Sequence, residues 1–186
     1  SEHGFLMYPI AAQRVGAKPV KVKEKNLKTD GKAIVKAVTK KTRIVFLANP
    51  NNPTGSYISK KELHELRKKL PASVLLVIDD AYAEYVTAGD YSDGIELAKS
   101  TENTIVLHTF SKIYGLPAAR LGWGYAAPDI IEMLHRVRSP FNVSTQAQMA
   151  GVAALADKKH IEKSRVHNAK WREKMMEEFK RIGLKP

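Results

Sequence analysis

The sequence contains no cysteine and no long apolar run, and each absence excludes a class of protein. Without cysteine there are no disulfides and no thiolate chemistry, which is compatible with a reducing compartment, so we expect a cytoplasmic protein. No window approaches the roughly eighteen consecutive apolar residues of a membrane span. Residues 1–16 lack a basic segment followed by an apolar one, so we expect neither a signal peptide nor a membrane partner.

Acidic residues are few relative to basic ones, 19 against 31, and the net charge is +12. A nucleic-acid-binding protein concentrates such an excess on one face, interleaved with aromatic residues or glycines. Here the lysines and arginines follow the periodicity of ordinary helices and strands, on their solvent faces. We therefore expect no nucleic-acid partner, while the positive charge favours an anionic small ligand such as a phosphate.

Apolar runs of the buried-strand type alternate with amphipathic helices along the chain. We expect buried strands at 43–48, 73–78, 103–110 and 121–127, and a short alternating strand at 18–23. Helices are expected at 5–15, 30–39 and 60–70, and from residues 128, 144 and 158. Ser59 and Glu62 form a capping box at the start of the 60–70 helix. This alternation predicts α/β architecture with a largely parallel sheet.

Polar side chains follow three of these strands at the points where the strands end. The loop Asn-Pro-Asn-Asn-Pro-Thr-Gly (49–55) follows the first strand, and Asp79 and Tyr82 follow the second. At the end of the third strand and directly after it come Thr109, Ser111 and Lys112, with Arg120 further on. Because ligands bind outside the carboxyl ends of strands in an open parallel sheet, this distribution predicts a binding site at that edge.

The residue types at these strand ends suit pyridoxal phosphate. A lysine at a partly desolvated strand end offers a free amine, which can form a Schiff base with an aldehyde cofactor. Asp79 could hold the pyridine nitrogen protonated, and Asn52 and Tyr82 could both donate to the phenolic oxygen. The hydroxyls and the guanidinium that follow the third strand could bind the phosphate.

Three segments carry a family resemblance: NPNNPTG (49–55), DDAYAEY (79–85) and TFSKIYGLPAARLGWG (109–124). In this order they resemble the signature segments of the fold-type I, class I/II aminotransferases. RSPFNVSTQAQMA (138–150) is similar to a segment of the histidinol-phosphate aminotransferase branch. The resemblance covers essentially the whole chain. It implies the large domain of a fold-type I pyridoxal-phosphate transferase, an incomplete three-layer α/β/α structure with a mainly parallel sheet flanked by helices.

The resemblance also assigns roles to individual residues. It implies that Lys112 is the Schiff-base lysine and Asp79 the partner of the pyridine nitrogen, and these two with Tyr82 are the expected catalytic residues. The expected cofactor-binding residues are Asn52, Asp79, Tyr82, Thr109, Ser111, Lys112 and Arg120, with Phe5 of GFLMY as the aromatic ring that stacks on the cofactor.

Other polar residues are given structural roles or left open. Asp80 is expected to be a neighbour of the site or a helix cap, and Asn49 and Asn51 to form their turn. Arg138 either touches substrate or cofactor or makes a structural pair. The six histidines show no metal-ligand spacing, so no metal site is expected.

The resemblance implies a transaminase of histidine biosynthesis that uses histidinol phosphate and 2-oxoglutarate, a ping-pong reaction, and a homodimer. It also implies that residues 1–157 are the central part of the large domain and that 158–186 form a helix leading to a small domain outside the chain. We therefore expect the isolated piece to be inactive. The alternatives are an aromatic amino-acid aminotransferase, a threonine-phosphate decarboxylase, a non-catalytic scaffold and, from the charge alone, nucleic-acid binding.

Overall fold

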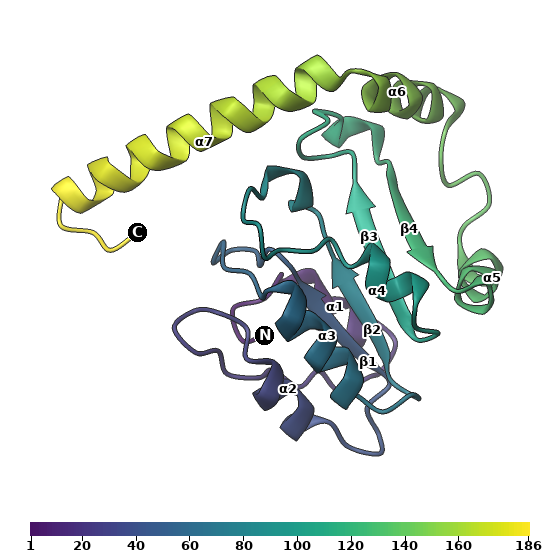
Figure 1. The fold of residues 1–186 in the computed structure, drawn as a ribbon. Coiled ribbons are helices and arrows are strands. Elements are labelled where there is room, and N and C mark those ends of the chain that lie inside the picture. Colours follow the sequence, from purple (N-terminus) through teal and green to yellow (C-terminus); the bar gives the residue numbers. More distant parts are fainter. The chain divides into compact units, whose positions relative to one another are not determined.

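Four strands form one sheet in the computed structural model, which describes all 186 residues (Figure 1). The strands β1 (Ile44–Ala48), β2 (Leu75–Asp79) and β3 (Thr104–Thr109) are parallel neighbours in chain order. The last strand, β4 (Gly122–Ala126), pairs antiparallel with β3 at the edge of the sheet. The expected mainly parallel sheet is therefore confirmed, and all four of its strands were predicted from the sequence. The burial expected for the strand at 121–127 is wrong, because β4 is an edge strand and four of its five residues are exposed.

Seven helices accompany the sheet, and six of them were predicted. They are α1 (Met7–Arg14), α2 (Gly31–Ala37), α3 (Lys60–Lys69), α4 (Ile95–Lys99), α5 (Pro128–Val137), α6 (Thr145–Ala156) and α7 (Lys158–Arg181). The short helix α4 was not predicted, nor were the two 3₁₀ turns at Ala83–Tyr85 and Pro117–Ala119. Both hydrogen bonds of the predicted capping box between Ser59 and Glu62 are present. No helix has the length and apolar character needed to cross a membrane.

The strand predicted at 18–23 is wrong. These residues have no strand neighbour with which to form a ladder. Their alternation has another origin, because Val22 packs against the hydrophobic core while its carbonyl oxygen accepts a hydrogen bond of 2.8 Å from the backbone N–H of Glu2.

The chain divides into two compact units. The first unit comprises residues 1–109 and 122–142 and contains the sheet with α1 to α5. The second unit comprises residues 110–121, the excursion between β3 and β4, together with 143–186, which contain α6 and α7. The expected boundary between a large domain and an interdomain helix at 157/158 stays a prediction.

The core of the first unit lies on both faces of the sheet, because successive side chains of a strand point to opposite sides. One face packs against α2, α3 and α4, and its buried residues include Val45, Leu47, Leu76, Ile78 and Val106 from the strands with Ile34, Leu63, Leu66 and Leu97 from the helices. The opposite face packs against α5 through Val77, Ile105 and Ile130, with Phe46, Leu75 and Leu107 against them. These faces form the expected three layers.

A buried arginine ties α3 to the start of the neighbouring strands. The side chain of Arg67 donates to the carbonyl oxygens of Leu70, Pro71, Val74 and Asn103 at distances between 2.8 and 3.0 Å. The guanidinium therefore satisfies backbone acceptors from the end of α3, the following turn and the residue that precedes β3.

A second polar cluster lies at the carboxyl ends of β2 and β3. Asp80 is completely buried, and its Oδ1 lies 3.2 Å from the hydroxyl of Tyr91, which also donates to the carbonyl oxygen of Asn49 at 2.7 Å. On the other side, Oδ2 of Asp80 lies 3.8 Å from Nε2 of the buried His108, whose ring stacks on Trp123 with centroids 4.2 Å apart. Burial raises the pKa of Asp80 well above its ordinary value of 3.8.

Replacing Arg67 with alanine is expected to lower the free energy of unfolding by about 3 kcal/mol, because four carbonyl oxygens lose their donor. Urea unfolding followed by circular dichroism measures this change. The matched control is Lys68→Ala, an exposed neighbour on the same helix, which should change the free energy of unfolding by less than about 0.5 kcal/mol. Equal effects of the two variants would contradict the role given to Arg67.

The raised pKa of Asp80 predicts how the free energy of unfolding changes with pH. Because its pKa is raised in the folded state, the folded protein keeps a proton on Asp80 at pH values where the unfolded chain has released it. The free energy of unfolding should therefore decrease as the pH rises from about 4 through the folded-state pKa. Asp80→Asn should reduce this decrease, whereas Asp129→Asn, at an exposed carboxylate, should leave it unchanged. Urea unfolding between about pH 4 and pH 8 tests the difference.

Candidate active site

Asp79 is the last residue of β2, and two hydrogen bonds hold its carboxylate. The backbone N–H of Ala81 donates to Oδ1 at 3.2 Å, and the hydroxyl of Tyr8 donates to Oδ2 at 2.7 Å. Tyr8 is 71 residues away in the sequence and lies on α1. The sequence analysis did not select Tyr8, although it is the last residue of GFLMY. Nothing in that segment indicates a contact with Asp79.

The ring of Tyr8 is itself packed between two other aromatic rings. It stacks on Phe46 of β1 with centroids 4.9 Å apart and an interplanar angle of 11°, and it meets the edge of Phe5 at 5.5 Å. Phe5, the expected stacking residue, is therefore one ring removed from Asp79. Burial raises the pKa of Tyr8, and the neighbouring Asp79 carboxylate raises it further, so the hydroxyl remains protonated and acts as the donor.

Asn52 and Tyr82, the two expected donors to a phenolic oxygen, lie together. The side-chain nitrogen of Asn52 is 3.5 Å from the hydroxyl of Tyr82, although 30 residues separate them. Asn52 belongs to the loop after β1, and Tyr82 follows β2, so the parallel pairing of these strands explains the approach.

Asparagines hold the loop 49–55 in place. The buried side chain of Asn49 accepts from the backbone N–H of Ile58 at 2.9 Å and donates to the carbonyl oxygen of the same residue at 3.3 Å. Asn51, also buried, donates to the hydroxyl of Thr54 at 2.9 Å. Both residues thus have the turn-forming role that was expected of them.

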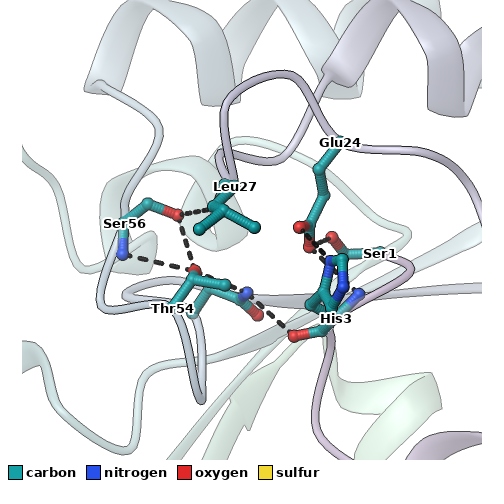
Figure 2. Close-up of polar contacts among 7 residues, drawn as sticks. Ser1, His3, Glu24, Leu27, Thr54 and Ser56 are labelled. Carbon is teal, nitrogen blue, oxygen red and sulfur yellow. Dashed lines mark hydrogen bonds and ion pairs between the residues drawn. The ribbon is translucent and has the colours of Figure 1, made fainter. Parts of the chain in front are cut away.

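The segment that leads into α1 is fastened to this loop and to Glu24 (Figure 2). Glu24 accepts hydrogen bonds from Ser1 and from both the backbone and the ring of His3, the ring nitrogen lying 2.9 Å from Oε2. Asn51 donates to the carbonyl oxygen of His3 at 3.2 Å. Burial alone would raise the pKa of Glu24, but the donors from Ser1 and His3 hold it below its ordinary value.

In the second unit, Ser111 and Arg120 converge. The guanidinium of Arg120 lies 3.4 Å from the hydroxyl of Ser111 and also donates to the carbonyl oxygen of Pro117. Arg120 has a φ of +51°, in the left-handed region that costs a non-glycine residue of order 1 kcal/mol or more. Such strain recurs at functional sites, and the φ of Arg120 is consistent with the expected role.

The excursion 110–121 packs on the helices of its own unit. Nε2 of His160, at the start of α7, is 3.1 Å from the carbonyl oxygen of Ile113. A Cβ added to Gly151 on α6 would lie 2.4 Å from Cδ2 of Leu121, so a larger residue would require the Leu121 side chain to move. Phe110 and Ile113 are buried, whereas Lys112 between them is exposed. The partial burial of Lys112 expected from the sequence is therefore not observed, because the excursion buries its apolar residues and leaves the lysine at the surface.

The expected site residues fall into both units. Within the first unit, the structure brings Asn52 to Tyr82 and links Phe5 to Asp79 through Tyr8. Thr109 ends β3 in the same unit, opposite Gly122 of β4, and the remaining expected residues, Ser111, Lys112 and Arg120, belong to the second unit.

Arg138, whose role was left open, makes local contacts. Its guanidinium donates to the side-chain oxygen of Asn142 at 2.9 Å and to Nδ1 of His135 at 3.0 Å. These contacts fit the structural alternative, and a contact of Arg138 with substrate or cofactor stays a prediction.

Comparison with known proteins identifies close relatives. A histidinol-phosphate aminotransferase of Rhodopseudomonas palustris (strain TIE-1) is 53% identical over 184 residues, and one of Rhodospirillum centenum is also 53% identical over 184 residues. Each match covers 99% of this chain but only 50% and 51% of the relative, so the chain spans about half the length of these curated relatives.

A solved structure has the same fold. The crystal structure of histidinol-phosphate aminotransferase from Sinorhizobium meliloti in complex with pyridoxal-5′-phosphate matches with a TM-score of 0.89 and 30% identity, over 94% of this chain and 48% of that one. The family model for aminotransferases of class I and II matches residues 1–186. Because this model matches the whole of the chain, the chain belongs to the class I and II aminotransferases.

Proposed function

We propose that this chain carries the cofactor-binding residues of a pyridoxal-phosphate-dependent transaminase that converts L-histidinol phosphate and 2-oxoglutarate to imidazole acetol phosphate and glutamate. The observation that carries the proposal is the 53% identity to histidinol-phosphate aminotransferases along 99% of the chain. We further propose that the complete protein is a cytoplasmic homodimer in the histidine biosynthetic pathway, as the family resemblance implies.

The residues of the first unit fit the polar edge of pyridoxal phosphate. Asp79 carries two carboxylate oxygens, each with one donor and with lone pairs to spare for the proton of a ring nitrogen. Asn52 and Tyr82 offer two donors 3.5 Å apart, a spacing at which both can reach a single phenolic oxygen. Together, the Asp79 acceptor and the two donors fit the polar atoms of the cofactor's ring.

The residues after β3 fit the phosphate and the aldehyde. Arg120 and Ser111 place a guanidinium and a hydroxyl 3.4 Å apart, a combination that suits a phosphate group. Thr109 adds a second hydroxyl at the end of β3. Lys112, the residue after Ser111, offers a primary amine, the group that a cofactor aldehyde requires for covalent attachment.

The chemistry that the cofactor supplies when bound is an electron sink for negative charge at the substrate's α-carbon. In the proposed reaction, the Asp79 carboxylate holds the proton on the ring nitrogen, and Asn52 and Tyr82 donate to the phenolic oxygen. Lys112 Nζ would hold the cofactor covalently at rest and, once released, would act as the base that takes the proton of the substrate's α-carbon and as the acid that returns it.

Lys112→Ala is expected to abolish covalent attachment of pyridoxal phosphate. After incubation with the cofactor and reduction with borohydride, peptide mass mapping should find the added mass on the peptide that contains Lys112 in the unchanged protein and not in the variant. Lys163→Ala, at an exposed lysine of the same unit, should leave the labelling unchanged. Labelling that persists in the Lys112 variant would contradict the assignment.

The substrate is tested on the complete natural polypeptide that contains these residues. It should form glutamate from 2-oxoglutarate with histidinol phosphate faster than with aromatic amino acids, and it should not decarboxylate threonine phosphate. A preference for one of the other substrates would refute the proposed specificity while leaving the cofactor assignment standing. Because the chain spans about half the length of its relatives, we expect the 186 residues alone to show no such turnover.

A further inference from the structure

We propose that Tyr8 is a positioning residue for Asp79, and that its hydroxyl orients the carboxylate toward the ring nitrogen of the bound cofactor. The inference rests on the proposed function, in which Asp79 is the partner of that nitrogen. Tyr8 does not itself touch the reacting atoms in this proposal; it acts through Asp79.

The backbone of Asp79 is fixed, so the main motion left to the residue is rotation of its carboxylate. The backbone of Asp79 is fixed because β2 pairs with a strand on each side, and Asp79 lies opposite Ala48 of β1 and Leu107 of β3. The donor from Ala81 holds one oxygen at 3.2 Å, which is a weak contact, and the donor from Tyr8 holds the other at 2.7 Å. Tyr8 therefore supplies the stronger of the two restraints.

Tyr8 is held well enough to act as such a restraint. Its ring stacks on Phe46, a residue of the sheet, and meets Phe5 edge to face. Since α1 has no buried residue of its own, these ring contacts and the segment before the helix set the position of Tyr8. That segment is fastened through His3 to Glu24 and to Asn51 of the loop 49–55 (Figure 2).

The same arrangement keeps the hydroxyl of Tyr8 protonated. The hydroxyl is half-buried beside a carboxylate, and both burial and the negative charge oppose loss of its proton. A phenol that stays protonated donates to Asp79 throughout the physiological pH range. This leaves for the cofactor the second lone pair of Oδ2 and the lone pair of Oδ1 that the N–H of Ala81 does not use.

The test compares two ligands that differ only at the ring nitrogen. The dissociation constants of pyridoxal phosphate and of its 1-deaza analogue, in which C–H replaces the nitrogen, are measured by fluorescence titration of the complete natural polypeptide containing these residues. Tyr8→Phe should raise the constant for pyridoxal phosphate about tenfold, the effect of losing one charge-assisted hydrogen bond. The constant for the analogue should change less than about twofold, because the analogue makes no bond to Asp79.

The matched control is Tyr57→Phe. Tyr57 also donates to an aspartate, Asp90, at 2.7 Å, but this pair is exposed and lies outside the proposed site. The control should leave both dissociation constants unchanged. Thermal unfolding followed by circular dichroism checks that Tyr8→Phe, which retains the ring and its stack on Phe46, keeps the fold.

Asp79→Asn separates failure of this inference from failure of the proposed function. If Asp79→Asn weakens binding of pyridoxal phosphate but Tyr8→Phe does not, the role of Tyr8 is refuted and that of Asp79 stands. If Asp79→Asn has no effect, the proposed role of Asp79 fails and the inference fails with it. Tighter binding in Tyr8→Phe, or equal weakening for both ligands, would also overturn the inference, since Tyr8 would then compete with the cofactor or act through packing alone.

Discussion

Parallel hydrogen bonding between β1, β2 and β3 requires that helices connect the strands and cover both faces of the sheet. It also brings the carboxyl ends of the three strands to one edge. The polar loop after Ala48, the carboxylate of Asp79 and the hydroxyl of Thr109 are placed by this pairing. A segment distant in the sequence can then add to the edge, as α1 does when it brings Tyr8 to Asp79. The polar groups that follow the strands thus lie at one edge because the strands run in the same direction.

Much of the fold could be predicted because it depends on local patterns. Continuous apolar runs of strand length mark β1 to β3, and the capping box at Ser59 marks the start of α3. The error at 18–23 shows the limit of this reasoning: alternation reports which side chains are buried, but a strand also needs a neighbour for its backbone. The helix α4 has only five residues, too few for its periodicity to be recognised.

The candidate site was predictable where its residues directly follow strands, and unpredictable where they depend on distant contacts. Asn52 and Tyr82 were assigned to the same atom from the sequence, and they lie together. Tyr8 was missed because it belongs to α1 and follows no strand of the sheet, and the buried contact between Asp80 and His108 was missed because no motif marks it. The burial expected for Lys112 was inferred from its place after β3, but the chain leaves the sheet at Phe110 and packs on α6 and α7 instead.

Gly151 gives the second unit an unusual sensitivity to sequence change. Most positions on the surface of a helix accept many side chains, but here a single methyl group would meet Leu121 at 2.4 Å. The first carbon of any side chain would require the side chain of Leu121, the neighbour of Arg120, to move, although Gly151 itself bears no chemical group. A residue with nothing to contribute to chemistry can therefore affect the packing beside a residue that bears a reactive group.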